Sequence, residues 1–321
     1  MPGSARGKAL TKRFAAIDIG TNAILLLVAD MKANGTFRVL DDRAEITRLG
    51  EGVDRTRKIG SEGEERTVEV LRSYLARCRD LGAVEVVTAG TSALRDAQNA
   101  GNFTSRLQQE LGLDLRVLSG EEEAAYSYLA VQRGLALGEK EVLVVDVGGG
   151  STELIWGKAG ALHRSVSLDL GSVRLTERFL TSDPVRDEEY AELTRAVDSE
   201  LEALRRRWRV AGRFHTMVGI AGTFTTLAAI EKRLRQYSHS QVHGSRLSRT
   251  EVRRQLGLFR AKSVAERRRI PGLEPKRADV ILAGAVLIDR IMAFFRMDEV
   301  TVSDQGIRYG LLHERLSSVY G

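Results

Sequence analysis

Cysteine, proline and histidine are all scarce, since the 321-residue chain has one cysteine, four prolines and five histidines. A single cysteine excludes any disulfide within the chain, and with five scattered histidines it cannot build a zinc site of the usual Cys/His spacing. The lack of disulfides leads us to expect a cytoplasmic, reducing location. The chain also has no Pro- or Ser-rich linker that would mark a domain boundary.

Long hydrophobic runs are missing as well. The longest, AILLLVA at 23–29, has the length of a strand and is far below the roughly 18 residues that indicate a membrane span. Residues 1–12 are basic but contain no apolar segment, so they do not resemble a secretory signal. We expect a flexible basic tail there, and no membrane partner.

Three common catalytic or nucleotide-binding patterns are absent, namely Walker A, G-x-G-x-x-G and G-x-S-x-G. Acidic residues are outnumbered, with 43 Asp and Glu against 49 Lys and Arg, which gives a formal net charge of +6. This balance favours anionic partners, without indicating a specific nucleic acid. Basic runs at 205–209, 232–235, 246–254 and 267–269 are each typical of a solvated helix face, but together they suggest a shared anion-binding surface.

The sequence contains an internal repeat. FAAIDIGTNAILLLVAD at 14–30 and LVVDVGGGSTELIWG at 143–157 both run from an apolar strand through Asp, Gly and small polar residues into a second strand. Asp18 and Asp146 are 128 residues apart, and Gly20 and Gly148 keep the same offset. Each unit is typical of a β-hairpin, and a weaker third turn lies at 217–230.

The rest of the chain alternates between strand and helix patterns. This alternation predicts an α/β fold, and two copies of one opening unit predict two related lobes. We expect a first lobe over 13–128 and a second over 129–321, with the final helix at 306–318 packing back on the first. Further strands are predicted at 36–43, 84–90, 115–119, 163–171 and 299–304, and helices at 62–80, 99–111, 121–133, 171–180, 187–207, 277–295 and 306–317.

The glycine-rich turn in DVGGGSTEL at 146–154 would expose successive backbone N–H groups, which form a concave site for anions. The carboxylates of Asp146, Glu153 and Asp18 would reach a divalent cation, and Mg²⁺ fits because it prefers oxygen ligands and shares them with phosphates. The alternative is a hairpin that needs glycines only for its turn.

SGEEEAAY at 119–126 predicts a helix start in which Ser119 and Glu122 form a capping box. Glu123 has no capping role, so it is either an exposed glutamate or a general base that deprotonates water. Arg95 follows a strand and a small-residue turn. Its planar guanidinium suits either a phosphate or a salt bridge.

Seven motifs, in this order along the chain, resemble those of the exopolyphosphatase / guanosine pentaphosphate phosphohydrolase (Ppx/GppA) family. They are DIGTN (18–22), RLGEGV (48–53), GTSALRDA (90–97), SGEEEA (119–124), DVGGGSTEL (146–154), GIAGT (219–223) and RADVILAGA (277–285). The resemblance implies the actin / sugar kinase / Hsp70-like (ribonuclease H-like) fold, with a phosphate-binding cleft between two lobes. It also leads us to expect the short form of the family, without the C-terminal HD-like extension.

The resemblance assigns roles residue by residue. Glu123 matches the family's catalytic base, Glu122 the preceding glutamate of the same motif, and Arg95 an arginine that contacts phosphate. Asp146 and Glu153, with Asp18 opposite, match the carboxylates associated with Mg²⁺, for which Mn²⁺ is an alternative. The implied phosphate-binding residues are Gly20, Thr21, Asn22, Gly148, Gly149, Gly150, Ser151, Gly222 and Thr223. The family often has a serine where this chain has Ala23, which puts one hydroxyl contact in question.

The implied reaction is Mg²⁺-dependent hydrolysis of the terminal phosphoanhydride of inorganic polyphosphate. Hydrolysis of guanosine pentaphosphate is the nearest alternative, and a weakly active sensor of polyphosphate or of guanosine penta- and tetraphosphate is another. A sugar or acetate kinase would share the fold, but the triple-glycine turn together with Glu123 favours a hydrolase. The resemblance also makes a homodimer plausible.

Overall fold

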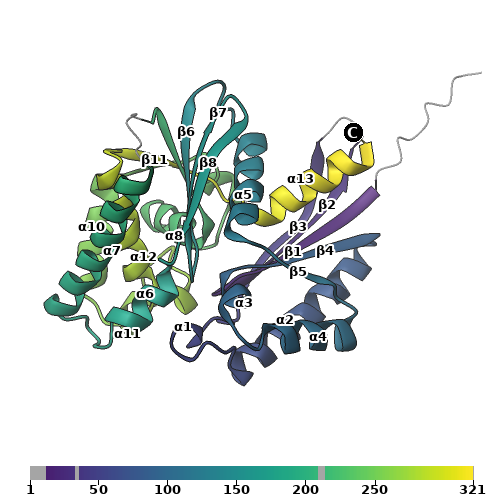
Figure 1. Ribbon diagram of the computed structural model, residues 1–321, viewed down its shortest axis with the longest axis horizontal. Coiled ribbons are helices and arrows are strands. Elements are labelled where there is room, and N and C mark those ends of the chain that lie inside the picture. The colour runs from purple at the N-terminus through teal and green to yellow at the C-terminus, as the bar shows by residue number, and fades with distance from the viewer. Residues whose placement is uncertain (1–11, 33–35, 209–213, 321) are drawn as a thin grey trace, which may run out of the picture.

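The computed structural model describes residues 12–32, 36–208 and 214–320. The predicted N-terminal tail lies outside these residues except for Lys12, which begins the first strand. Two lobes are visible in Figure 1, each built around its own β-sheet. Among the described residues, the structure contains no helix whose length and apolar character would let it cross a membrane.

The first sheet has five strands in the order β3-β2-β1-β4-β5. β2 is antiparallel to both β1 and β3, whereas β4 is parallel to β1 and β5 is parallel to β4. The strands of this sheet are β1 (Lys12–Ile19), β2 (Ala23–Met31), β3 (Phe37–Ile46), β4 (Glu85–Gly90) and β5 (Leu115–Val117).

The second sheet repeats this arrangement in the order β8-β7-β6-β9-β11 and adds β10, antiparallel to β11, at its edge. The directions also repeat, since β6, β7 and β8 are antiparallel neighbours whereas β9 and β11 continue in parallel. The predicted α/β fold with two related lobes is therefore confirmed. The strands are β6 (Glu141–Val147), β7 (Thr152–Lys158), β8 (Ala161–Leu168), β9 (Thr216–Ile220), β10 (Arg246–Ser248) and β11 (Glu299–Val302).

Both faces of the first sheet are covered by helices. Ala15 and Ile17 of β1 join a core with α2 (Ser61–Asp80) and α4 (Ala100–Leu111). Phe14 and Ala16, on the opposite face of the same strand, pack with α5 (Gly120–Gly134) and α13 (Ile307–Tyr320). A strand buried on both faces must be apolar throughout, which explains the continuous run FAAI. In Figure 1, α13, coloured yellow, lies along β1 and β2.

α5 lies between the two lobes. Tyr126 and Ala130 face the first sheet, whereas Ala124, Tyr128 and Val131 pack against β6 and β7 of the second. The predicted lobe boundary at residue 128 falls inside this helix and remains a prediction.

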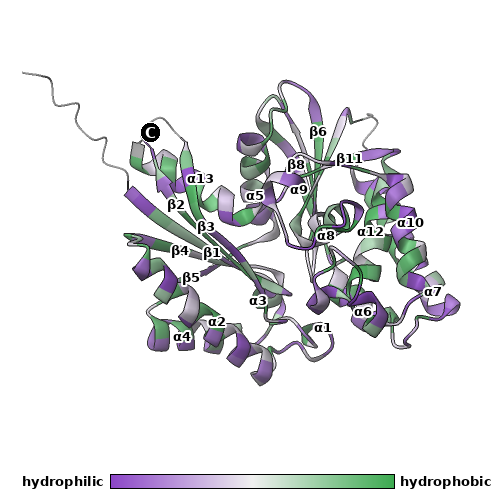
Figure 2. Cartoon of the chain, turned by 180° about the vertical axis from the view of Figure 1, so that it is seen from behind, coloured by the Kyte–Doolittle hydropathy of each residue, from purple (hydrophilic) through white to green (hydrophobic). Residues whose placement is uncertain are grey.

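The core of the second lobe is formed by its sheet and five helices. α12 is buried on nearly all sides, and Figure 2 shows it as largely hydrophobic. The helices are α6 (Ser172–Phe179), α7 (Asp187–Trp208), α8 (Ala221–Glu231), α10 (Arg249–Arg260) and α12 (Ile281–Phe294).

Most predicted elements are found within a few residues of their expected bounds, but two differences stand out. The predicted helix 277–295 begins only at Ile281, because Pro275 opens a separate 3₁₀ turn at Pro275–Arg277. α10 was not predicted, since its arginines hide an apolar face made of Val252, Leu256 and Phe259. Four shorter helices were also missed, namely α1 (Val53–Thr56), α3 (Ser92–Asp96), α9 (His239–Val242) and α11 (Val264–Arg267).

Candidate active site

A cleft of about 680 Å³ lies between the lobes and is lined by residues of both. It lies at the carboxyl ends of β1 in the first sheet and of the parallel neighbours β6 and β9 in the second, and such strand ends commonly border a ligand-binding crevice. All three glycine-containing turns of the sequence border it. The predicted site residues that line the cleft are Asp18, Gly20, Thr21, Asn22, Glu123, Asp146, Gly148, Gly149, Ser151, Glu153, Gly222 and Thr223.

Four of the buried carboxylates that line this cleft belong to the predicted site residues. The exposed fractions are 4% for Glu123, 7% for Asp18, 8% for Asp146 and 2% for Glu153. Burial raises the pKa of Asp146 to about 6 and of Asp18 and Glu153 to about 7, and the charge of Asp146 adds to the last two. Burial, followed by repulsion from Glu153, also raises the pKa of Glu123. Burial and mutual repulsion therefore make the ionised forms of these carboxylates costly, and a bound cation would offset that cost.

Three of these carboxylates have fixed partners. Ser127 donates a hydrogen bond of 2.8 Å to Asp146, and Ser167 donates one of 2.7 Å to Glu153. Arg95 forms an ion pair with Glu123 and donates a second hydrogen bond to the Leu118 carbonyl. Asp18 differs, because its buried Oδ1 atom has no hydrogen-bond partner in the described part of the chain.

The carboxylate set fits a divalent cation that is shared with substrate. Within residues 12–32, 36–208 and 214–320, no three His, Cys, Asp or Glu side chains lie close enough together to hold a metal on their own. Mg²⁺ does not need such a cage, since it keeps several waters and binds substrate phosphates. A divalent cation would provide a partner for the buried Oδ1 atom of Asp18 and would lower the raised pKa values of Asp146 and Glu153.

The glycine turn after β6, the glycine loop (Gly148–Ser151), is held from behind by α6. The N–H groups of Ser172 and Val173 donate to the carbonyls of Gly148 and Gly149 over 3.0 and 2.9 Å. In a trans peptide the C=O and N–H bonds point in opposite directions. The N–H groups of Gly149 and Gly150 therefore point away from α6, as an anion site requires. The N–H of Gly148 instead closes the turn on the Ser151 carbonyl at 3.0 Å.

The contact between the two lobes gives a second reason for glycine in the glycine loop, which could not be inferred from the sequence. A β-carbon at Gly149 would lie 2.9 Å from Cβ of Thr21, and one at Gly150 would lie 2.6 Å from Oγ of Ser92. Both neighbours belong to the first lobe. The loop lacks side chains partly because the two lobes touch there.

Two predicted catalytic residues lie behind the cleft wall. Glu122 closes the predicted capping box, since its Oε2 accepts from the Ser119 N–H over 2.8 Å, and it also pairs with Arg116. This role is structural and keeps Glu122 out of the cleft. Arg95 does not line the cleft either, and its guanidinium is bound to Glu123.

Among the described residues of the four basic runs, not every arginine is free to bind an anion. Arg267 is 1% exposed and donates to the Phe259 carbonyl, while Arg249 and Arg254 pair with Asp289 and Glu251. From these runs, only Leu234 and Arg235 line the cleft in the described part of the chain.

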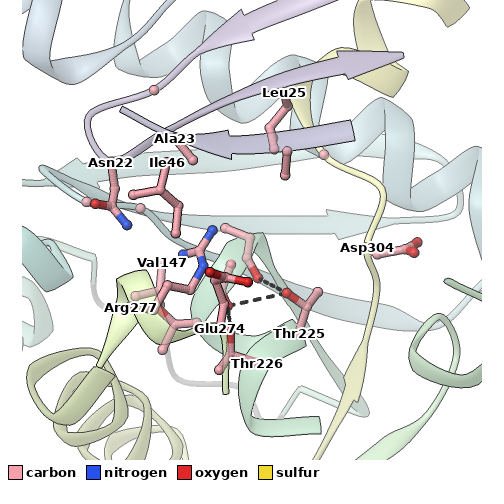
Figure 3. Close-up of a pocket in the computed structure, with 18 of the residues that line it drawn as sticks. Asn22, Ala23, Leu25, Ile46, Val147, Thr225, Thr226, Glu274, Arg277 and Asp304 are labelled. Atoms are coloured by element: carbon pink, nitrogen blue, oxygen red, sulfur yellow. Dashed lines mark hydrogen bonds between the residues drawn. The ribbon is translucent and has the colours of Figure 1, made fainter. Parts of the chain in front are cut away.

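Several residues that line the cleft had no role assigned to them from the sequence. Figure 3 shows Asn22, Ala23 and Ile46 of the first lobe across from Arg277 and Glu274 of the second. Arg277 was quoted within a motif but not assigned a role. Other lining residues without an assigned role are Leu25, Asp42, Thr225, Thr226, Arg235, Tyr237, His239, Asp304 and Arg308.

Asp304, which lines the cleft, contacts two histidines. Its carboxylate lies 2.6 Å from Nδ1 of His239 and 3.1 Å from Nδ1 of His243. The Nε2 atom of His243 faces the Gly134 carbonyl at 3.1 Å, so that nitrogen carries a proton. Acceptors near both ring nitrogens favour the protonated form of His243. The hydrogen bonds to Asp304 raise the pKa of both histidines.

This cluster predicts a pH-dependent contribution to stability. A histidine with a raised pKa stabilises the fold fully below its unfolded pKa of about 6.5, and this contribution is lost as pH rises through the folded value. Burial would raise the pKa of Asp304, but the hydrogen bonds from His239 and His243 outweigh it and hold that pKa below its usual range. Its contribution is therefore present above about pH 3.9 and is lost as pH falls through the lowered pKa.

We expect Asp304→Asn to lower the free energy of unfolding more at about pH 6 than at about pH 8.5, because both histidines keep their protons only at the lower pH. Urea unfolding of the variant and of the unchanged protein at both values measures the difference. An equal loss at the two values would contradict the ionic contribution.

Comparisons with known proteins agree with this architecture. The Ppx/GppA phosphatase family model matches residues 27–319. Exopolyphosphatase 2 of Mycobacterium tuberculosis is 36% identical over 316 residues, which cover 93% of this chain and 97% of that protein. The crystal structure of the Aquifex aeolicus member of the Ppx/GppA family has a TM-score of 0.81 at 35% identity, over 97% of this chain and 100% of that one.

A bifunctional 3-dehydroquinate synthase/phosphatase of Fusobacterium nucleatum is 31% identical over 94% of this chain. The chain spans 46% of the length of that relative. The family match covers most of both lobes and the cleft-lining motifs from residue 90 onward, whereas DIGTN at 18–22 precedes it. The chain belongs to the Ppx/GppA phosphatase family and is a hydrolase of phosphoanhydride bonds.

Proposed function

We propose that this protein is an exopolyphosphatase, which releases the terminal phosphate of inorganic polyphosphate in a reaction that requires Mg²⁺, or alternatively Mn²⁺. The observation that carries the proposal is the position of Glu123. Its buried carboxyl group, with a pKa raised by burial, lies in the same cleft as the glycine loop and three further carboxylates. A carboxylate whose pKa is raised is a stronger base and is better suited to accept a proton from water.

In this proposal, Glu123 orients the attacking water and accepts its proton at a carboxylate oxygen. Arg95 holds that carboxylate in place through their ion pair. The N–H groups of the glycine loop and the hydroxyl of Thr21 bind oxygens of the terminal phosphoryl group. Asp18, Asp146 and Glu153 would hold the divalent cation, which would neutralise charge on the transferred phosphoryl group when bound.

The remaining phosphates need cations further along the cleft. Arg277 approaches Gly222 so closely that a β-carbon there would lie 2.2 Å from its Nη1 atom. Burial lowers the pKa of Arg277, and no carboxylate among the described residues forms an ion pair with it. Arg235 lines the same region. These two guanidinium groups are suited to a polyanionic substrate.

Hydrolysis of guanosine pentaphosphate is a second candidate, and one observation favours it. The ring of Tyr237 is 49% exposed at the cleft, and Leu25 and Ile46 provide an apolar surface on the first lobe. Such groups suit a nucleobase better than a phosphate chain. A weakly active sensor of either ligand is the third possibility. A homodimer and a cytoplasmic location remain predictions.

Phosphate release decides among these functions. We expect metal-dependent release from long-chain polyphosphate, and loss of that release when EDTA removes the cation. Guanosine pentaphosphate is assayed in parallel, and preference for it would promote the second candidate. Binding of either substrate without any release would identify a sensor and would overturn the proposed hydrolysis of polyphosphate.

A further inference from the structure

A buried arginine connects the glycine loop to the first lobe. Arg174, in the first turn of α6, has a side-chain exposure of 7%. Its Nε atom donates a hydrogen bond of 2.7 Å to the Gly150 carbonyl. Its two terminal nitrogens bind Asp54 and Asp96 of the first lobe. One guanidinium group therefore joins three segments that lie far apart in the sequence.

The first of these contacts orients the glycine loop. The Gly150 carbonyl is turned toward Arg174, so the N–H of Ser151, in the same peptide unit, points the opposite way. The backbone N–H of Arg174 also donates to the Gly149 carbonyl over 3.1 Å. Arg174 thus holds two carbonyls of the loop whose N–H groups serve as anion donors in the proposed function.

The second set of contacts reaches the candidate base. Asp96 directly follows Arg95 in the short helix α3, and Arg95 forms the ion pair with Glu123. Because both residues belong to one helical turn, the position of Asp96 fixes the position of Arg95. A continuous chain of charge-assisted contacts therefore runs from the Gly150 carbonyl through Arg174 and α3 to Glu123.

An ion pair that only stabilises the fold would not require one side chain to bind three acceptors at once. A lysine ammonium is a compact charge and cannot present the flat fork by which arginine binds three acceptors at once. Neighbouring Arg178 offers a comparison, since it pairs with Asp54 over 2.5 and 2.6 Å but is 45% exposed. No hydrogen bond within the described residues joins the Arg178 side chain to the glycine loop.

We propose that Arg174 is a positioning residue for the reaction. It holds the glycine loop and α3 in register across the lobe boundary, so that the loop amides and Glu123 act on the same phosphoryl group. This inference rests on the proposed function. It differs from a contribution to substrate binding, because Arg174 does not line the cleft.

The test is Arg174→Lys, with Arg178→Lys as its matched control. We expect Arg174→Lys to lower kcat by about 10- to 100-fold, since small misplacements of reacting groups have effects of that size. KM should change by less than about threefold, because the cleft-lining groups remain. Arg178→Lys should leave kcat within about twofold of the unchanged protein.

Asp96→Asn provides the second kinetic variant. It removes the partner of Arg174 on α3 and leaves the glycine loop intact. We expect the double variant Arg174→Lys/Asp96→Asn to have the same kcat as the less active of the two single variants, because both substitutions break the same chain of contacts. Multiplied losses would instead mean that the two residues act independently, and would overturn the positioning role.

Hydrogen exchange tests the same inference without any turnover. In Arg174→Lys, the hydrogen-bonded amides of residues 94–95, 148 and 172–174 should exchange faster, while those of α2 and α12 keep their protection. A loss of protection across the whole chain, or a fall in kcat that only follows the folded fraction, would show a purely structural role. If the unchanged protein releases no phosphate, the proposed function fails, and hydrogen exchange still decides the role of Arg174.

Discussion

Glu123→Gln is expected to reduce phosphate release from polyphosphate by about 10²- to 10⁴-fold while polyphosphate still binds. Glutamine keeps the shape of the side chain but cannot accept the proton of the attacking water. Steady-state phosphate release and equilibrium binding of polyphosphate, measured on the same preparation, separate the two effects. Unchanged release would show that Glu123 is not the base.

The stability of Glu123→Gln tests whether a fall in phosphate release is caused by unfolding and not by loss of the base. The pKa of Glu123 is raised by burial and by Glu153, so its ionised form destabilises the fold. We therefore expect Glu123→Gln to unfold at the same denaturant concentration or a higher one, as is common when a functional charge is removed. Glu121→Gln is the matched control, because Glu121 is exposed in the first turn of the same helix. It should leave phosphate release unchanged.

Arg308→Met is expected to lower the free energy of unfolding by about 3–5 kcal/mol, which is the usual cost of removing one partner from a buried ion pair. The side chains of Arg308 and Asp42 are only 8% and 6% exposed. Two hydrogen bonds of 3.0 and 3.1 Å join them, and the Tyr309 hydroxyl is the other donor to Asp42. Without Arg308, the Asp42 carboxylate remains buried and largely uncompensated. Urea unfolding measures the loss.

Arg315→Met is the control, because Arg315 lies on the same helix and pairs with Glu85 of the same sheet. Those side chains are 37% and 39% exposed, so the loss should be below about 1 kcal/mol. The double variant Arg308→Met/Asp42→Asn should recover part of the stability that Arg308→Met loses. Equal losses in Arg308→Met and Arg315→Met would contradict the view that burial decides the difference.

Local patterns made much of the fold predictable. Strand, turn and strand follow one another within 14–30 and again within 143–157, so both hairpins could be identified without knowledge of distant contacts. The same patterns placed Asp18 and Asp146 at the ends of equivalent strands, which the structure brings to one cleft. The Ser119 capping box also depends on residues only three apart.

Long-range contacts could not be predicted in this way. The partners of Arg174 on the first lobe are 120 and 78 residues away, and nothing local distinguishes it from the exposed Arg178. The close approach of Gly150 to Ser92 depends on how the two lobes meet, so the sequence suggested only the anion-binding cause for that glycine. The burial of Arg267 could not be predicted from its basic run, because its tertiary surroundings set that burial.

The position of α13 affects the order in which the parts of the hydrophobic core are completed during synthesis. All five strands of the first sheet have been synthesised once the ribosome passes Val117. One face of that sheet, however, packs on Leu311 and Leu312, which follow the whole of the second lobe. α5 can cover part of this face early, but the part that α13 covers stays exposed during that interval, a state in which nascent chains are prone to aggregate. The half of the protein that is translated first is therefore among the last parts to complete its core.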